Sequence, residues 1–300
     1  MKKLLVATTA LVATAGMAAA DVNLSGSARF GIQHNSGAVG VEKTRLEKRF
    51  TLNIDGVTES DMGLRAGARV RIRSDENAGT AVSGARVFVS GGGLTVAAGN
   101  ILGALESVPG LYNPSVGLTG LHWAGLVTNT NAKGRFTWDA FSSTGNGAEG
   151  LEAIYSAAGF TVHVSHSSAD LSGVPGAERQ NAIHVAYNWE GWTFAAAYLD
   201  SSINTNDKWY LGVIGNIGDF GVGLTYADND GVGKVAVNGN YRIGDLTISG
   251  YVADEDSAGA KTSYGLGALY SLGGGINLVG GAERSYNGNT YADFGVRISF

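Results

Sequence analysis

The chain is built of short segments in which apolar and polar residues alternate. From Val22 to Gln33, apolar residues hold the even positions and polar residues the odd ones, with one glycine in each set. A period of two is that of a β-strand whose two faces meet different surroundings. Helical spacing of apolar residues at i, i+3, i+4 and i+7 persists nowhere in the chain. The pattern therefore predicts an all-β fold.

Sixteen such segments follow one another, joined by connections that alternate in length, seven short and eight longer. The predicted strands cover 22–33, 45–55, 62–73, 85–90, 94–100, 150–157, 160–168, 181–189, 192–200, 208–216, 220–228, 233–243, 246–254, 262–272, 276–286 and 290–300. Short and long connections in alternation are typical of bacterial outer-membrane barrels, whose short turns face the periplasm. We predict a 16-stranded antiparallel transmembrane β-barrel.

The third strand is the most informative, because it places four arginines on one face. Arg65, Arg69, Arg71 and Arg73 stand opposite apolar residues that run from Met62 to Ile72. A dry core accepts buried arginines only where each has a partner, whereas a wet lumen accepts them freely. The polar face of the sheet should therefore line a water-filled channel, which sixteen strands are enough to enclose.

One long stretch, 101–149, interrupts the alternation. It holds two of the three prolines, and Glu106 is its only acidic residue before Trp138. Loops of this length inside a compact domain are usually functional. We predict a pore-constricting loop, the third long loop, which folds into the lumen. The short alternating run 134–142 would make an odd number of strands, so we assign it to the returning limb of this loop.

The N-terminal residues and the net charge indicate that the chain is exported and argue against nucleic acid as a partner. Residues 1–20 begin with Lys2 and Lys3, continue through an apolar stretch and end in three alanines, which predicts a secretory signal peptide followed by a barrel domain over 21–300. Its removal leaves 19 basic and 26 acidic residues, a net charge of −7, which argues against nucleic acid as a partner. The chain has no cysteine, so disulfides do not stabilise it.

Aromatic residues gather beside the predicted short turns. They are Trp189, Trp192, Phe220, Tyr241, Tyr270 and the terminal Phe300. Such residues form girdles where a barrel meets the membrane interface. The alternative is the ordinary enrichment of aromatic residues in strands.

Four stretches carry a resemblance to a known family: NLSGSARFGIQ at 23–33, GVTESDMGLRAGARVRI at 56–72, VAAGN at 96–100 and ADFGVRISF at 292–300. The chain resembles the general diffusion porins of alphaproteobacteria, the Rhodobacter type. The resemblance implies a homotrimer of 16-stranded barrels in the outer membrane of a Gram-negative bacterium, in contact with lipid and lipopolysaccharide. It also implies a third loop folded inward to form the constriction.

The resemblance further implies basic residues on the wall facing acidic residues on the loop. Here the basic set comprises Arg29, Arg45, Arg49, Arg65, Arg69, Arg71 and Arg73. The acidic side offers Glu106 alone, and the loop charges Glu106 and Asp139 are balanced by Lys133 and Arg135. We therefore expect the arginines to set the charge preference and to favour anions weakly. Alternatively, the arginines pair with Glu47, Asp55 and Glu106 and brace the wall, and both roles are compatible.

The apolar residues of the loop also permit two interpretations. Leu111, Tyr112, Leu118, Leu121 and Trp123 either pack the loop against the wall or narrow the pore towards apolar solutes. We favour packing.

Catalytic and metal chemistry receive little support. His163 and Ser165 share one face of a predicted strand and His166 the other, so they do not form a nucleophile and base, and we predict no enzyme. Asp254, Glu255 and Asp256 cluster in one outer loop, and carboxylates so grouped are able to bind calcium, the one cofactor considered.

The predicted function is passive diffusion of small hydrophilic solutes and ions through an outer-membrane porin. Three alternatives stay open: a substrate-preferring anion channel of the same fold, a structural or adhesive surface barrel plugged by its loop, and an exported soluble β-sandwich.

Overall fold

The protein was analysed as a computed structural model, which describes residues 21–76, 78–112, 114–134, 140–145, 147–173, 178–203 and 206–300. The predicted signal peptide lies outside these residues, as does most of the run 134–142. Among the described residues, no helix is long and apolar enough to cross a membrane.

Strands dominate the structure, and every strand pair is antiparallel. The strands are β1 (Asp21–Asn35), β2 (Thr44–Glu59), β3 (Arg65–Asp75), β4 (Ala78–Val82), β5 (Arg86–Gly91), β6 (Leu94–Gly99), β7 (Glu149–Ala157), β8 (Phe160–Ser168), β9 (Arg179–Trp189), β10 (Trp192–Ser201), β11 (Lys208–Ile217), β12 (Phe220–Asn229), β13 (Gly233–Ile243), β14 (Leu246–Glu255), β15 (Ser263–Gly273), β16 (Ile276–Arg284) and β17 (Thr290–Ser299). Two short 3₁₀ helices, η1 (Trp123–Gly125) and η2 (Ala169–Ser172), lie in loops.

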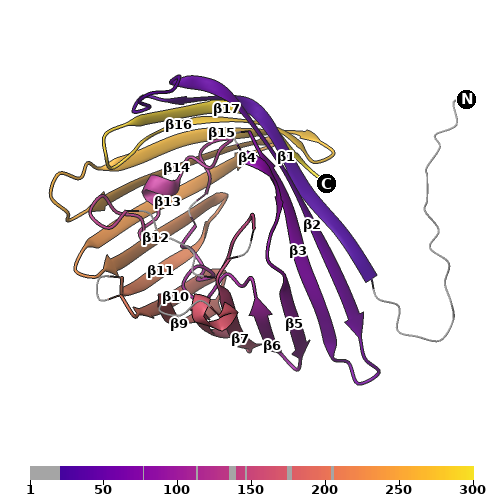
Figure 1. Ribbon diagram of the computed structural model, residues 1–300. Coiled ribbons are helices and arrows are strands. Elements are labelled where there is room, and N and C mark those ends of the chain that lie inside the picture. The colour runs from indigo at the N-terminus through magenta and orange to yellow at the C-terminus, as the bar shows by residue number, and fades with distance from the viewer. Residues whose placement is uncertain are drawn as a thin grey trace, which may run out of the picture.

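The sheet closes on itself, because β1 pairs with both β2 and β17 (Figure 1). Closure continues to the last residue, where Phe300 and Gly26 exchange backbone hydrogen bonds of 2.7 and 3.0 Å. A closed barrel leaves no strand edge unpaired, which a membrane requires of a β-structure.

The predicted loop at 74–84 is partly wrong, because it contains β4. Ile72 pairs with Val82, whereas lower on the same strand Arg69 pairs with Arg86. β4 and β5 thus share one position in the wall, next to β3, and the seventeen strands form a 16-stranded barrel as predicted. The break falls at Ser83, which forms an isolated bridge with Gly145 of the long loop.

The two faces of the wall follow the predicted alternation. On β1, Val22 is 67% exposed and Leu24 59%, and these apolar side chains point outward. The outward residues continue as an apolar surface around the barrel, on nearly every strand. Lipid is the surrounding that stabilises such a surface.

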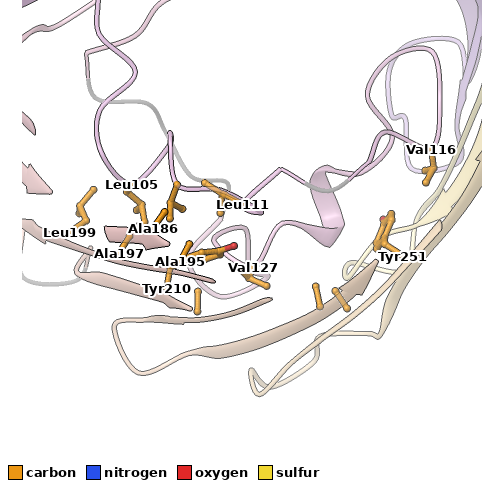
Figure 2. Packing of buried hydrophobic residues seen from close by; sticks show 14 of the residues in the cluster. Leu105, Leu111, Val116, Val127, Ala186, Ala195, Ala197, Leu199, Tyr210 and Tyr251 are labelled. Carbon is orange, nitrogen blue, oxygen red and sulfur yellow. The ribbon is translucent and has the colours of Figure 1, made fainter. Parts of the chain in front are cut away.

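The long loop between β6 and β7, hereafter the insert, folds back into the barrel and packs against one side of the wall (Figures 1 and 2). Leu105, Leu111, Val116, Leu121 and Val127 form one buried cluster with inward residues of β9 to β14. Several of these wall residues are alanines: Ala186, Ala195, Ala197, Ala227, Ala236 and Ala253. Small inward side chains let the insert approach the backbone of the wall closely.

Aromatic residues lie at the ends of strands beside the short turns, as predicted. Trp189, Phe220, Tyr270 and Phe300 are exposed, and the Phe220 ring stacks on Tyr241 with centroids 4.3 Å apart. This band belongs at the periplasmic membrane interface.

Candidate pore constriction

The wall opposite the packed insert carries a dense set of arginines. In the register of the sheet, Arg297 of β17 stands directly across from Arg29 of β1, which stands across from Arg49 of β2. The next strand, β3, adds Arg71 and Arg73 opposite Asn53 and Thr51. Directly opposite side chains lie about 5 Å apart at Cβ, so Arg297, Arg29 and Arg49 are close neighbours, whereas Arg73 and Arg71 lie two and four residues further along the wall.

Carboxylates of the wall pair with most of this set. Arg29 binds Glu47 at 2.6 Å, and Arg69 binds Asp55 at 2.5 Å. Asp75 is shared, because it accepts from Arg73 at 2.7 Å and also from Arg49. The predicted bracing by Glu47 and Asp55 agrees with these contacts.

Arg71 differs, because its described partners are uncharged. Its Nε donates to Asn53 at 2.9 Å and a terminal nitrogen donates to Ser143 at 3.2 Å, while the guanidinium lies 5.1 Å from the centre of the Phe141 ring. No carboxylate of the described residues lies within ion-pair distance of Arg71. Arg297 is similar, because its described acceptors are the Gly117 and Leu118 carbonyls, so two arginines of this set lack a direct ion pair, although Glu106 acts electrostatically on Arg71 at longer range.

A cavity of about 310 Å³ lies in front of these side chains. Five arginines line it, Arg29, Arg49, Arg71, Arg73 and Arg297, together with Ser27, Ala28, Thr51 and Asn53. No carboxylate is among these lining residues. We call this space the arginine cavity.

Three predicted arginines, Arg45, Arg65 and Arg69, do not line the arginine cavity. Arg45 is exposed near the beginning of β2, beside a long loop, whereas Arg65 is exposed at the beginning of β3, beside a short turn. They therefore occupy opposite ends of the barrel. Arg65 lines a separate cavity with Asp55 and Arg69.

Glu106 lies on the insert, but it does not line the arginine cavity. The residue is only 6% exposed, and one carboxylate oxygen accepts a hydrogen bond of 2.7 Å from the Tyr112 hydroxyl. The Tyr112 ring meets the Trp123 ring edge-on at 6.1 Å. Burial, with a smaller contribution from the positive charge of Arg297, lowers the pKa of neighbouring His122 to about 4, which leaves it neutral at physiological pH.

The tip of the insert is held by two charged residues of the closing strand β17. Asp293 accepts hydrogen bonds from the Leu118 and Thr119 amides, each at 2.7 Å, and from the Thr119 hydroxyl at 2.6 Å. Arg297 donates to the carbonyls of Gly117 and Leu118 at 3.0 Å. Leu111, Leu118 and Leu121 are buried, which agrees with packing against the wall, whereas Tyr112 is 40% exposed and Trp123 is half-buried.

Sequence reasoning missed Arg86 and Arg297 as members of the basic wall. Arg86 binds Glu152 at 2.7 Å, and Glu152 also contacts His163 at 3.1 Å. Both arginines sit on the polar side of alternating strands, so the pattern of positions was sufficient to find them. His163 shares a face with Ser165, whose hydroxyl accepts from the Ala104 amide of the insert at 2.8 Å.

The predicted calcium residues do not converge. Asp254 and Glu255 point to opposite faces of β14, where Asp254 accepts from the Thr262 hydroxyl and Glu255 lies 3.6 Å from Lys234. Among the described residues, no group of three or more acidic or histidine side chains is placed to hold a metal ion. Calcium binding at Asp254, Glu255 and Asp256 stays a prediction.

An antiparallel barrel that is apolar outside, charged inside and entered by its own long loop is the architecture of an outer-membrane channel. Comparison with known proteins identifies the family. A family model described as Gram-negative porin matches residues 7–290, and the chain belongs to that family.

Two curated relatives are similar over nearly the whole length. The chain is 32% identical to a porin of Fuscovulum blasticum and 30% identical to a porin of Rhodobacter capsulatus, with 93% of this chain and 100% of each relative covered. Among solved structures, a triple mutant of Rhodopseudomonas blastica porin superposes with a TM-score of 0.82 at 31% identity, covering 93% of this chain and 100% of that one.

The protein is therefore a multi-pass protein of the outer membrane that forms a channel for passive diffusion. Family membership implies a channel rather than an enzyme.

Proposed function

We propose that the constriction lies between the basic wall and the insert, and that it favours small anions over cations. The arginine cavity carries the proposal, because five guanidinium groups line it and no carboxylate does. A low-dielectric wall focuses the potential of such charges into the aqueous path. Rings of arginine in pores act in this way on anions.

The carboxylates behind the cavity reduce this field without cancelling it. Glu47 binds Arg29, and one carboxylate, Asp75, serves both Arg49 and Arg73. Arg71 is paired with neutral groups. An excess of positive charge thus remains where the lumen is narrowed, although the mature chain as a whole is acidic. Because part of the positive charge is compensated, we expect a weak rather than a strong preference for anions.

The zero-current potential across a planar bilayer under a KCl gradient tests this proposal. Wild type should give the sign of anion preference, and Arg71→Gln should lower the chloride-to-potassium permeability ratio about two- to fourfold, because one charge at about 10 Å in water contributes about 0.4 kcal/mol to each ion.

Arg242→Gln is the matched control, since Arg242 lies on β13 beside a short turn and donates to the Gly244 carbonyl. It should leave the ratio nearly unchanged. A wild-type channel that prefers potassium would refute the proposal.

We also propose that the protein assembles as a homotrimer, as the resemblance to Rhodobacter-type porins implies. The short strand β6 supports this arrangement, because it has six residues, whereas β4 continues the position of β5 along β3. A strand that crosses a bilayer needs about 9–11 residues. Another subunit would cover the wall beside β5 and β6, where the short β6 leaves it low.

A further inference from the structure

The arginine cavity gathers five like charges on one face of the sheet. Arg297, Arg29 and Arg49 are directly opposite one another on three adjacent strands. Like charges in that arrangement destabilise a sheet. Functional sites are where proteins keep such unfavourable charge clusters. A ligand of opposite charge would relieve the repulsion.

Hydrogen-bond donors in the cavity also lack protein acceptors. Arg49 and Arg73 use their Nε groups for Asp75, and Arg71 uses Nε and one terminal nitrogen. Within the described part of the chain, the terminal amino groups of Arg49 and Arg73 and the second amino group of Arg71 bond no acceptor. These groups come from two adjacent strands and border one space.

We propose that the arginine cavity is a binding subsite for phosphate and polyphosphate groups of passing solutes. The proposal rests on the anion preference proposed above and specifies the solute class. Guanidinium groups match phosphate oxygens in pairs of parallel hydrogen bonds. A phosphate presents several oxygens in different directions, which suits donors that approach from both β2 and β3.

The volume of the cavity and its positive charge both favour small phosphorylated solutes. A volume of about 310 Å³ lies at the lower end of small-molecule pockets, about 300–1,000 Å³, so it admits a small phosphorylated solute rather than a polymer. A phosphate monoester carries nearly two charges at neutral pH, because its second pKa is about 6. Ser27 and Thr51 add hydroxyl groups to the lining. Binding must be weak enough for release, as in any conducting site.

Block of chloride current by potassium pyrophosphate tests the subsite. The channel is held in KCl without divalent cations, and the control bath receives KCl to equal ionic strength. Wild type should lose current in a saturable way. Arg71→Gln should raise the half-blocking concentration about tenfold, equal to about 1.4 kcal/mol. Arg71→Lys keeps the charge and should lie between the two, and Arg242→Gln should match wild type.

The outcomes separate this inference from the anion preference. Anion preference without pyrophosphate block, or block that is equal in Arg71→Gln and wild type, overturns the subsite alone. Cation preference with block that depends on Arg71 overturns the anion preference and keeps the subsite. Far-UV circular dichroism establishes that each variant is folded, and Arg71→Lys supplies the test if Arg71→Gln is not.

Discussion

At the residue scale, Asp293 determines where the tip of the insert sits. Its carboxylate, only 7% exposed, receives three hydrogen bonds from Leu118 and Thr119, which are about 175 residues away in the chain. A hydrogen bond to a charged group contributes about 1.5–3 kcal/mol, more than a neutral one. Asp293 is therefore a positioning residue for the constriction.

Asp293→Asn should loosen the tip without unfolding the barrel. The variant loses the charge and one acceptor oxygen, and we expect docking of the tip to weaken by about 2 kcal/mol. Single-channel recordings should show larger current fluctuations, while the Tm of the barrel stays near that of wild type.

Asp219→Asn makes the same chemical change in the short turn between β11 and β12 and should leave the recordings unchanged. Quiet currents in Asp293→Asn would mean that packing of Val116 and Leu118 alone fixes the tip.

Alternation along the strands was enough to place Arg29, Arg49, Arg69, Arg71 and Arg73 on the lumenal face. It was not enough to foresee that Arg29 lies level with both Arg49 and Arg297, because register between strands depends on turns and on closure. Nor did it show that Glu106 accepts from Tyr112, which depends on the path of the insert.

At the element scale, a row of glycines on the inner wall makes room for the insert. A Cβ atom on Gly267 of β15 would lie 1.7 Å from the Val116 carbonyl oxygen, and one on Gly281 of β16 would lie 1.6 Å from it. Gly31 and Gly295 likewise border the Leu118 side chain. Only residues without a side chain allow the insert backbone to approach the sheet so closely.

Gly281→Ala should therefore displace the insert from β15 and β16. Overpacking costs about 1–3 kcal/mol, and relief by movement of the insert is easier than distortion of the sheet. We expect a changed single-channel conductance.

Gly56→Ala is the matched control, because a Cβ on Gly56 of β2 meets nothing within 4 Å. Equal conductance in Gly281→Ala and wild type would show that the insert tolerates the added methyl group in place.

The strands were predictable because each carries its own alternation, and their boundaries agree within a few residues. β4 was missed because Ala78–Val82 is short and its pairing with β3 is a tertiary contact. The path of the insert could not be predicted from the sequence for a similar reason. Its partners, such as Ala186, Tyr210 and Tyr251, lie on strands far along the chain.

At the scale of the whole molecule, the wall is uneven in height. β6 spans about 20 Å along the strand, given about 3.3 Å per residue, whereas β9 and β13 have eleven residues. The outward side chains of the low part are apolar, among them Val87, Val89 and Val96. This part is the surface that we expect to meet neighbouring subunits.

A polar substitution in the low wall should weaken the trimer. Val89→Gln buries an unpaired amide between subunits, and native mass spectrometry in detergent should show monomers increasing relative to wild type.

Val237→Gln is the matched change on β13, across the barrel from β5 in the order of strands, and should leave the trimer intact. Monomeric wild-type protein would refute the proposed assembly.

Pairing of β1 with β17 also has a consequence for biogenesis. Phe30 of β1 pairs with Val296 of β17. The barrel is therefore closed by pairing its first strand with its last, and these two strands are synthesised far apart in time. The nascent sheet keeps an open edge until translation ends, and an open edge invites pairing with other chains. Such long-range contacts also form slowly. The barrel can therefore close only once its C-terminal strand is available.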